Sequence, residues 1–133
     1  MNAPLRAVIA DDSALFRAVL RRAFVNLGGV EIVAQVANGE EAVEQIRKLG
    51  PDLLTLDLNM PEMGGRDALK GILAIDPSAK VIIVTAMNQK LLRGDLLSAG
   101  AKEVLGKPIR LEQLLGAVRD VLEGGSGGQK EIN

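Results

Sequence analysis

Short apolar runs alternate along the chain with longer segments in which apolar residues recur every three or four positions. The runs have the length of strands and are continuous rather than alternating with polar residues. Continuous runs are typical of strands buried on both faces of a parallel sheet. The pattern predicts five strands, at residues 7–10, 32–36, 53–56, 81–84 and 104–106.

The longer segments predict five helices. In the first, apolar residues recur at helical spacing from Phe16 to Leu27, with Ser13 placed to cap its start and Gly28 its end. This spacing predicts one buried stripe, made of Phe16, Val19, Leu20, Ala23, Phe24 and Leu27. The predicted helices cover about 14–27, 39–49, 65–75, 92–99 and 111–123.

The last two helices carry more specific predictions. The fourth contains Gly94 in its interior, which costs about 1 kcal/mol relative to alanine, so we expect it to be the least rigid of the five. Its predicted core-facing residues are Leu92, Leu96 and Ala99. The fifth helix is predicted to bury Leu111, Leu114, Leu115, Val118, Val121 and Leu122.

Strand and helix alternate five times along the chain. Such alternation requires right-handed crossovers, which place helices on both faces of a parallel sheet, so the sequence predicts a doubly wound α/β fold. A chain of 133 residues is long enough for one core and too short for two. We expect this domain to occupy residues 1–123. Residues 124–133 open with a glycine-rich segment of linker composition and are predicted to form a flexible tail or linker.

Composition narrows the possible partners. Hydrophobic residues make up 47% of the chain and charged residues 25%, which is ordinary for a folded soluble domain. The apolar runs are too short to span a membrane, and the first six residues do not resemble a secretory signal, so we expect a cytoplasmic protein without a membrane partner. A net charge of −1, with acids and bases interspersed, provides no electrostatic surface for direct nucleic-acid binding.

The chain has no cysteine and no histidine. The missing thiols exclude disulfides, thiolate chemistry and zinc–sulfur sites, and the missing imidazoles exclude a histidine from any catalytic or phosphorelay role in this chain. Phosphorylation of the chain would therefore fall on a carboxylate or a hydroxyl group.

Polar residues of a particular kind follow four of the predicted strands. Asp11 and Asp12 follow the first, Asp57 the third, Thr85 the fourth and Lys107 the fifth. Because the carboxyl ends of parallel strands lie side by side, and ligands bind in the crevice there, we expect these side chains to converge in one pocket. Taken singly, each of these residues has a simpler explanation, since aspartates often cap helices, threonine favours strands and isolated lysines are usually solvated.

Three converging carboxylates repel each other, so at pH 7 they need a cation or raised pKa values. Mg²⁺ fits this need, because it prefers oxygen ligands and is usually held by one or two carboxylates and several waters. Asp12 and Asp57 would supply carboxylates, and a backbone carbonyl near Asn59 would supply a further ligand. Pro108 restricts Lys107 to extended backbone, which directs its ammonium group toward the carboxylates.

Taken together, these motifs resemble those of a known family. Asp11-Asp12, the run from Leu56 to Pro61, Thr85-Ala86 and Lys107-Pro108 are similar to the signature of bacterial two-component response-regulator receiver domains, over about residues 5–123. Segments 85–89 and 98–102 look most similar to the chemotaxis-type single-domain regulators. The resemblance implies a flavodoxin-like, five-stranded parallel sheet of order 2-1-3-4-5 with five helices.

The resemblance also implies roles for individual residues. Asp57 would accept a phosphoryl group from a phosphohistidine on a sensor histidine kinase. Asp11 and Asp12 would place Mg²⁺, Lys107 would neutralise phosphoryl charge, and Thr85 would move toward the phosphate as a switch. The signal would reach an output protein or domain through the fourth helix, fifth strand and fifth helix. Such a chain is not an enzyme in the ordinary sense, because it catalyses only its own phosphorylation and dephosphorylation.

Three positions depart from the family pattern. Val104 stands where the family often has tyrosine or phenylalanine, so the aromatic half of the usual switch is missing. Gly64 replaces a common Asp or Asn, which predicts a looser loop beside Asp57, and Met87 is apolar where a polar side chain would orient the hydrolytic water. These departures leave the phosphoryl lifetime open.

The sequence is also compatible with other functions. The same fold would suit the amino-terminal receiver module of a longer multidomain regulator, or a degenerate receiver that acts as a constitutive docking module. A phosphatase with Asp57 as nucleophile is a candidate from another class, but the haloacid dehalogenase type wants a second aspartate two positions on, where this chain has Asn59.

Overall fold

The computed structural model describes residues 3–123, so the tail predicted at 124–133 lies outside the described residues. Five parallel strands form one sheet in the order β2-β1-β3-β4-β5. The predicted fold class and strand order are therefore confirmed. The strands are β1 (Leu5–Ala10), β2 (Val30–Val36), β3 (Leu53–Leu56), β4 (Val81–Thr85) and β5 (Glu103–Gly106).

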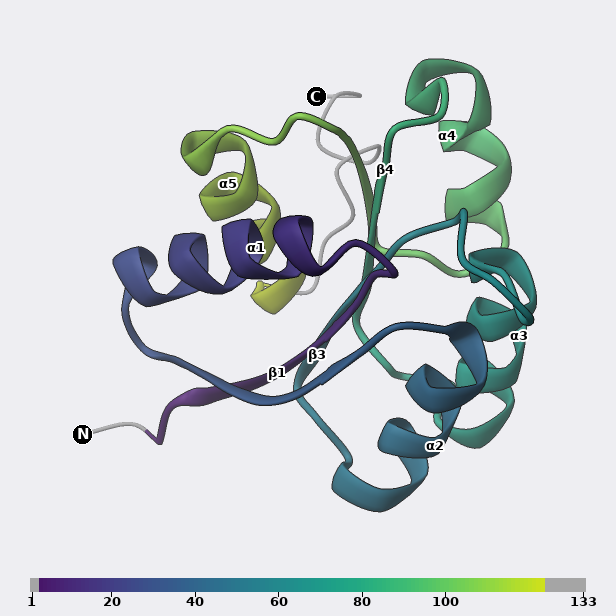
Figure 1. The fold of residues 1–133 in the computed structure, drawn as a ribbon, viewed down its shortest axis with the longest axis horizontal. Helices are drawn as coiled ribbons and strands as arrows, with labels where there is room; N and C mark the ends of the chain where they lie inside the picture. The colour runs from purple at the N-terminus through teal and green to yellow at the C-terminus, as the bar shows by residue number, and fades with distance from the viewer. Residues whose placement is uncertain (1–2, 124–133) are drawn as a thin grey trace.

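Five helices cover the two faces of this sheet. Figure 1 shows α1 and α5 on one face and α2, α3 and α4 on the other. Side-chain caps fix where some of them begin: the Ser13 hydroxyl accepts the N–H of Phe16, and the Asn38 amide oxygen accepts the N–H of Glu41. The helices are α1 (Ala14–Leu27), α2 (Gly39–Leu49), α3 (Gly65–Ile75), α4 (Gln89–Ser98) and α5 (Leu111–Leu122).

The core consists of two apolar layers, one on each face of the sheet. Successive strand residues point to opposite faces, so β1 sends Val8 and Ala10 toward α2, α3 and α4, and Ala7 and Ile9 toward α1 and α5. The strands β1, β3 and β4 are buried on both faces, as their continuous apolar sequences predict. The central strands thus hold their carboxyl ends rigidly in place.

The edge strand β2 differs from the prediction. It begins at Val30, two residues before the predicted start, and Glu31 and Gln35 are exposed, so burial on both faces is wrong for this strand. The reason is its place in the sheet, because only β1 flanks it and the helices cover it incompletely.

Several helix residues that were predicted to be buried are exposed. Val19 of α1 is 43% exposed, and Ala99, which follows α4, is exposed as well. In α5 the exposed residues are Leu111, Leu115 and Leu122. The apolar stripe of each helix is wider than the strip that contacts the sheet, so residues at its margin stay in solvent.

The other edge strand, β5, is closed by an ion pair with α4. The backbone N–H of Val104 donates to the carboxylate of Glu103 (2.9 Å), and its carbonyl accepts from the guanidinium of Arg93 (3.0 Å). Arg93 and Glu103 also pair directly, at 2.5 Å. Because an open strand edge can pair with other chains, these bonds both protect β5 and tie α4 to it.

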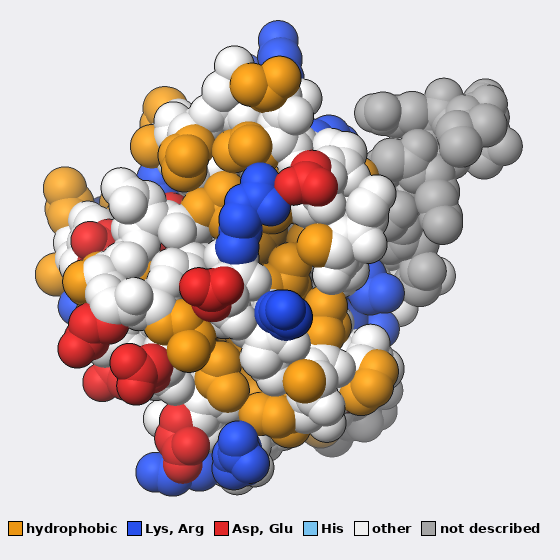
Figure 2. Space-filling view, turned by 90° about the vertical axis from the view of Figure 1, so that its right-hand side faces the viewer, with side chains coloured by type: hydrophobic (Ala, Val, Ile, Leu, Met, Phe, Trp, Pro, Cys, Tyr) orange, Lys and Arg blue, Asp and Glu red, His pale blue; other side chains and the backbone are white. Residues whose placement is uncertain are grey.

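The face formed by α2, α3 and α4 carries charged side chains of both signs, with hydrophobic side chains exposed among them (Figure 2). Within residues 3–123, no helix is both long enough and apolar enough to cross a membrane.

Candidate functional site

Two central strands deliver aspartates to the same edge of the sheet. Asp11 follows β1 and Asp57 follows β3. Their backbones continue the sheet, because the N–H of Asp11 donates to Val36 and the N–H of Asp57 donates to Ala10, both at 3.0 Å. The sheet therefore fixes the separation of the two side chains.

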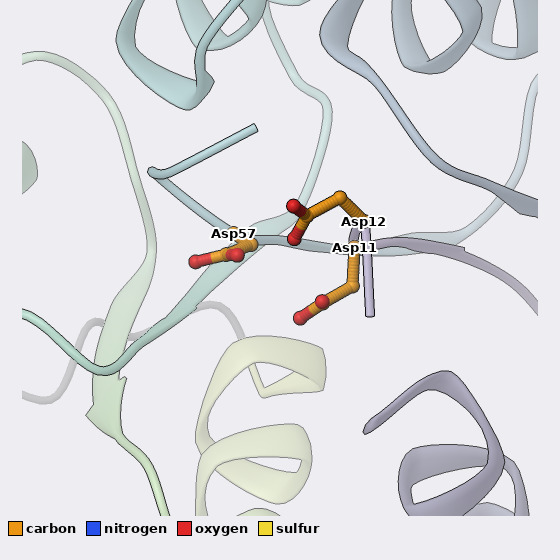
Figure 3. A group of neighbouring side chains, drawn as sticks. All are labelled: Asp11, Asp12 and Asp57. Carbon is orange, nitrogen blue, oxygen red and sulfur yellow. The ribbon is translucent and has the colours of Figure 1, made fainter. Parts of the chain in front are cut away.

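Asp12 joins these two residues in a cluster of three carboxylates. One carboxylate oxygen from each residue lies within 4.8 Å of the others. Figure 3 shows the three side chains lying close together where β1 and β3 end. Asp11 and Asp57 are buried, whereas Asp12 is exposed. The cluster therefore offers a divalent cation an oxygen-rich site that opens to solvent on one side.

Lys107, at the end of β5, reaches into the cluster. Its ammonium nitrogen lies 2.8 Å from a carboxylate oxygen of Asp11 and 3.5 Å from one of Asp57. The lysine backbone is anchored as well, because its N–H donates to the carbonyl of Thr85 at 2.8 Å. The Lys107–Pro108 peptide bond is cis. One cation thus stands between two buried anions.

The pKa of Asp57 is raised above its ordinary value. Burial is the largest cause, because it disfavours the charged form, and the nearby Asp11 adds to the rise. The attraction of Lys107 and the N–H of Asn59, which donates to the Asp57 carboxylate at 3.4 Å, act in the opposite direction. The positive charge of Lys107 therefore offsets only part of the effect of burial on this carboxylate.

Asp11 is held by two residues, Ser13 and Arg17, whose role at the site the sequence did not predict. The N–H of Ser13 donates to its carboxylate at 2.9 Å, and the guanidinium of Arg17 donates to its backbone carbonyl at 2.6 Å. Both residues belong to the start of α1. The first turn of the helix thus orients the acidic loop.

Thr85 ends β4 and is fully buried. Its hydroxyl accepts the N–H of Met87 at 3.1 Å, which closes the first turn after the strand. Met87 itself is half exposed. Asn59, the remaining predicted site residue, is exposed and contacts Asp57 through its backbone N–H.

Gly65 is a further residue whose role at the site the sequence did not predict. A Cβ atom here would lie 2.4 Å from the carbonyl oxygen of Asp57 and 2.6 Å from the Cα of Leu58, so only glycine fits. Its N–H also donates to Leu58 at 3.0 Å. Gly64 was expected to loosen the loop beside Asp57, whereas the neighbouring Gly65 packs directly against the backbone of Asp57.

Residues 7–119 match the model of the response regulator receiver domain. The chain belongs to this family. The receiver family serves in two-component signalling. The comparisons therefore confirm the predicted function, that of a phosphorelay receiver similar to the chemotaxis type.

Individual relatives agree with this assignment. The chemotaxis protein CheY of Thermotoga maritima is 40% identical over 87% of this receiver domain chain and 96% of its own length. A chain in the crystal structure of the CheX-CheY-BeF3-Mg+2 complex from Borrelia burgdorferi superposes with a TM-score of 0.85, at 34% identity over 90% of each chain. The response regulator domain of Thermotoga maritima CheB gives 0.84, at 30% identity over 90% of this chain and 97% of that one.

Proposed function

We propose that Asp57 accepts a phosphoryl group from a phosphohistidine on a sensor histidine kinase. The observation that supports this most is the position of Lys107, whose ammonium nitrogen lies within 3.5 Å of Asp57 inside a cluster of three carboxylates. A buried carboxylate beside a fixed cation is suited to attack phosphorus, because the cation offsets charge on the transferring oxygens.

The transfer is a direct displacement. A carboxylate oxygen of Asp57 attacks the phosphorus atom, the bond from phosphorus to the donor imidazole breaks, and an acyl phosphate forms. Lys107 pairs more closely with Asp11 than with Asp57 before transfer, at 2.8 Å against 3.5 Å. A phosphoryl group brings about −1.5 to −2 charges, so the ammonium group would then move toward Asp57.

Mg²⁺ is the cofactor that these residues fit. Asp11, Asp12 and Asp57 would hold it with the backbone carbonyl of Asn59, and the exposure of Asp12 leaves room for waters and a phosphoryl oxygen. When bound, Mg²⁺ supplies positive charge to the phosphoryl oxygens. The complex of the Borrelia burgdorferi relative contains both Mg²⁺ and beryllofluoride, which supports this assignment.

The signal would leave the site through Thr85. Thr85 is the last residue of β4, next to the segment that leads into α4, and its buried hydroxyl accepts the N–H of Met87. A phosphoryl oxygen at Asp57 would accept the hydroxyl proton of Thr85 and draw the side chain away from Met87. We infer that α4, β5 and α5 form the surface that an output partner reads. Val104 is buried and not aromatic, so it fills space in this switch rather than gating it.

The same proposal extends to the bounds of the domain, its localisation and its partners. We infer that the receiver domain extends over residues 1–123 and that the protein works in the cytoplasm without direct contact to nucleic acid or membrane. Its partners are the kinase and an output protein or domain, and it catalyses only its own phosphorylation and dephosphorylation. The same chain would also serve as the amino-terminal module of a longer regulator.

Intact mass measured after incubation with acetyl phosphate and Mg²⁺ tests the proposal. We expect one added phosphoryl group in the wild type and none in Asp57→Asn. Asp67→Asn, at an exposed position on α3, is the matched control and should be phosphorylated like the wild type. No uptake by the wild type in Mg²⁺ would contradict the proposal and favour a constitutive docking module.

A further inference from the structure

The ammonium group of Lys107 has an aromatic neighbour as well as two carboxylates. Its nitrogen lies 4.2 Å from the centre of the Phe16 ring. At this distance the electron-rich face of the ring attracts a cation, and the attraction grows when water is excluded. The lysine side chain is only 17% exposed, so this contact is largely desolvated.

The fold fixes the place of the Phe16 ring. Phe16 stands in the first turn of α1, and its backbone N–H donates to the hydroxyl of the capping residue Ser13 at 3.1 Å. The following residue, Arg17, is held by its bond to the Asp11 carbonyl. The same helix turn therefore sets both the acidic loop and the ring beneath the lysine.

Packing alone does not account for this arrangement. Phe24, the only other phenylalanine in the chain, is fully buried in the core between the sheet, α1 and α5. Phe16 is only partly buried at the margin of that same core. Its ring thus contributes one surface to the core and offers another to Lys107.

We propose that Phe16 is a positioning residue for Lys107. The face of the Phe16 ring holds the ammonium group of Lys107 over the acidic cluster while that group moves from Asp11 to a phosphoryl oxygen on Asp57. The lysine side chain is a flexible stem of four carbons, so its backbone does not fix the position of the ammonium group. A carboxylate partner alone would keep that group at Asp11. A ring face attracts a cation over a broad area, so it retains the group as it shifts. This inference rests on the proposed role of Asp57 as acceptor.

Substitutions at Phe16 distinguish the effect of its aromatic ring from the effect of its volume. In the full chain, Phe16→Leu should lower the rate of phosphorylation by acetyl phosphate about threefold to tenfold, the range that corresponds to a cation–π contact, while Phe16→Tyr should stay within about twofold of the wild type. Phe24→Leu removes a buried ring from the same core. It should lower the melting temperature at least as much as Phe16→Leu and leave the rate unchanged.

Fluorine NMR detects the contact without any phosphorylation. Protein grown with 4-fluorophenylalanine has two fluorinated positions, at Phe16 and Phe24, and a Phe24→Leu sample assigns them. Lys107→Met keeps most of the length of the side chain and removes its charge. We expect this change to move the Phe16 resonance and leave that of Phe24 in place. In wild-type protein, beryllofluoride with Mg²⁺ should also move the Phe16 resonance more than that of Phe24.

Two results would overturn the inference: a Phe16 resonance that is the same in wild type and Lys107→Met, or a Phe16→Leu rate equal to that of the wild type. The fluorine comparison of free proteins decides the matter even if the wild type accepts no phosphoryl group. Failure of phosphorylation in the wild type would instead overturn the acceptor role of Asp57.

Discussion

At the scale of single residues, burial and the ammonium group of Lys107 act in opposite directions on the carboxylate of Asp57. Burial raises the pKa of Asp57, and the ammonium group of Lys107 lowers it without cancelling the rise. Lys107 is nearer to Asp11, so its charge is shared between two anions. The buried carboxylate of Asp57 therefore makes the metal-free protein less stable at neutral pH than it would be without that charge.

Replacing this carboxylate should stabilise the metal-free fold. A raised pKa means that the folded state binds the proton more tightly than the unfolded state, so stability falls as pH rises from the unfolded value near 3.8 through the raised folded value. In EDTA at pH 7 we expect Asp57→Asn to melt at a higher temperature than the wild type. The gain should shrink as pH falls toward 4. A lower melting temperature for the variant at pH 7 would show that attraction to Lys107 outweighs burial.

Residues differ in how far the sequence could predict their part in the site. Asp11, Asp57 and Lys107 were predictable as neighbours, because each directly follows an apolar strand and the carboxyl ends of parallel strands lie side by side. Phe16 and Gly65 were not. The helical spacing of Phe16 indicates only a core position, and Gly65 is required by its approach to the backbone of Asp57, which no sequence pattern reveals.

At the scale of elements, α4 is held to the sheet largely through the edge strand β5. The ion pair between Arg93 and Glu103 also occupies the backbone groups of Val104, so one interaction fixes both the helix and the strand edge. The hydrophobic pattern predicted both elements but not this link, because ion pairs between a helix and a strand leave no periodic signal. The same limit applies to α5, whose apolar stripe does not reveal that its margin is exposed.

Removing the charge of Arg93 should loosen this link. Arg93→Met keeps most of the stem but leaves the buried Glu103 carboxylate and the Val104 carbonyl without their partner, which costs about 1–3 kcal/mol of unfolding free energy. Arg66→Met is the control, since Arg66 pairs with Asp95 at the surface and such pairs contribute about 1 kcal/mol or less. Urea unfolding measures both. Equal losses in the two variants would contradict the structural role of the Arg93 pair.

Phosphorylation should alter the same elements through Thr85. We expect beryllofluoride with Mg²⁺ to change amide-exchange protection in residues 86–106 of the wild type, because the Thr85 hydroxyl would leave Met87 for the phosphoryl analogue. Thr85→Ala should weaken this coupling by about 1 kcal/mol or more, the lower end of allosteric coupling energies. Identical protection with and without beryllofluoride would rule out a switch through α4.

At the scale of the whole molecule, the order of the strands creates the site. The two buried aspartates follow the neighbouring strands β1 and β3, and Lys107 arrives from β5 across β4. Strand–helix alternation was enough to predict the layers, but the order of the strands came from the resemblance to the receiver family. The exposed edge at β2 was missed because burial on both faces was predicted for all five strands alike, although Gln35 interrupts the apolar sequence of β2.

Mg²⁺ should stabilise the whole fold by binding only the native state. A ligand at a hundredfold excess over its dissociation constant adds about 2.7 kcal/mol. Melting followed by circular dichroism, which suits a chain without Trp or Tyr, should therefore rise in temperature with Mg²⁺. Asp12→Ala removes an exposed member of the carboxylate cluster and should lose most of that rise. An unchanged melting temperature at millimolar Mg²⁺ would contradict the metal site.

The central claim is that one carboxylate, that of Asp57, carries the phosphoryl group. Borohydride reduces an aspartyl phosphate to homoserine, so treatment after incubation with acetyl phosphate and Mg²⁺ converts the acceptor into a residue that peptide mass mapping can locate. We predict homoserine at position 57 alone, and none when Mg²⁺ is replaced by EDTA. Homoserine at position 11 or 12, or an unmodified Asp57 in protein that has taken up phosphate, would contradict the account.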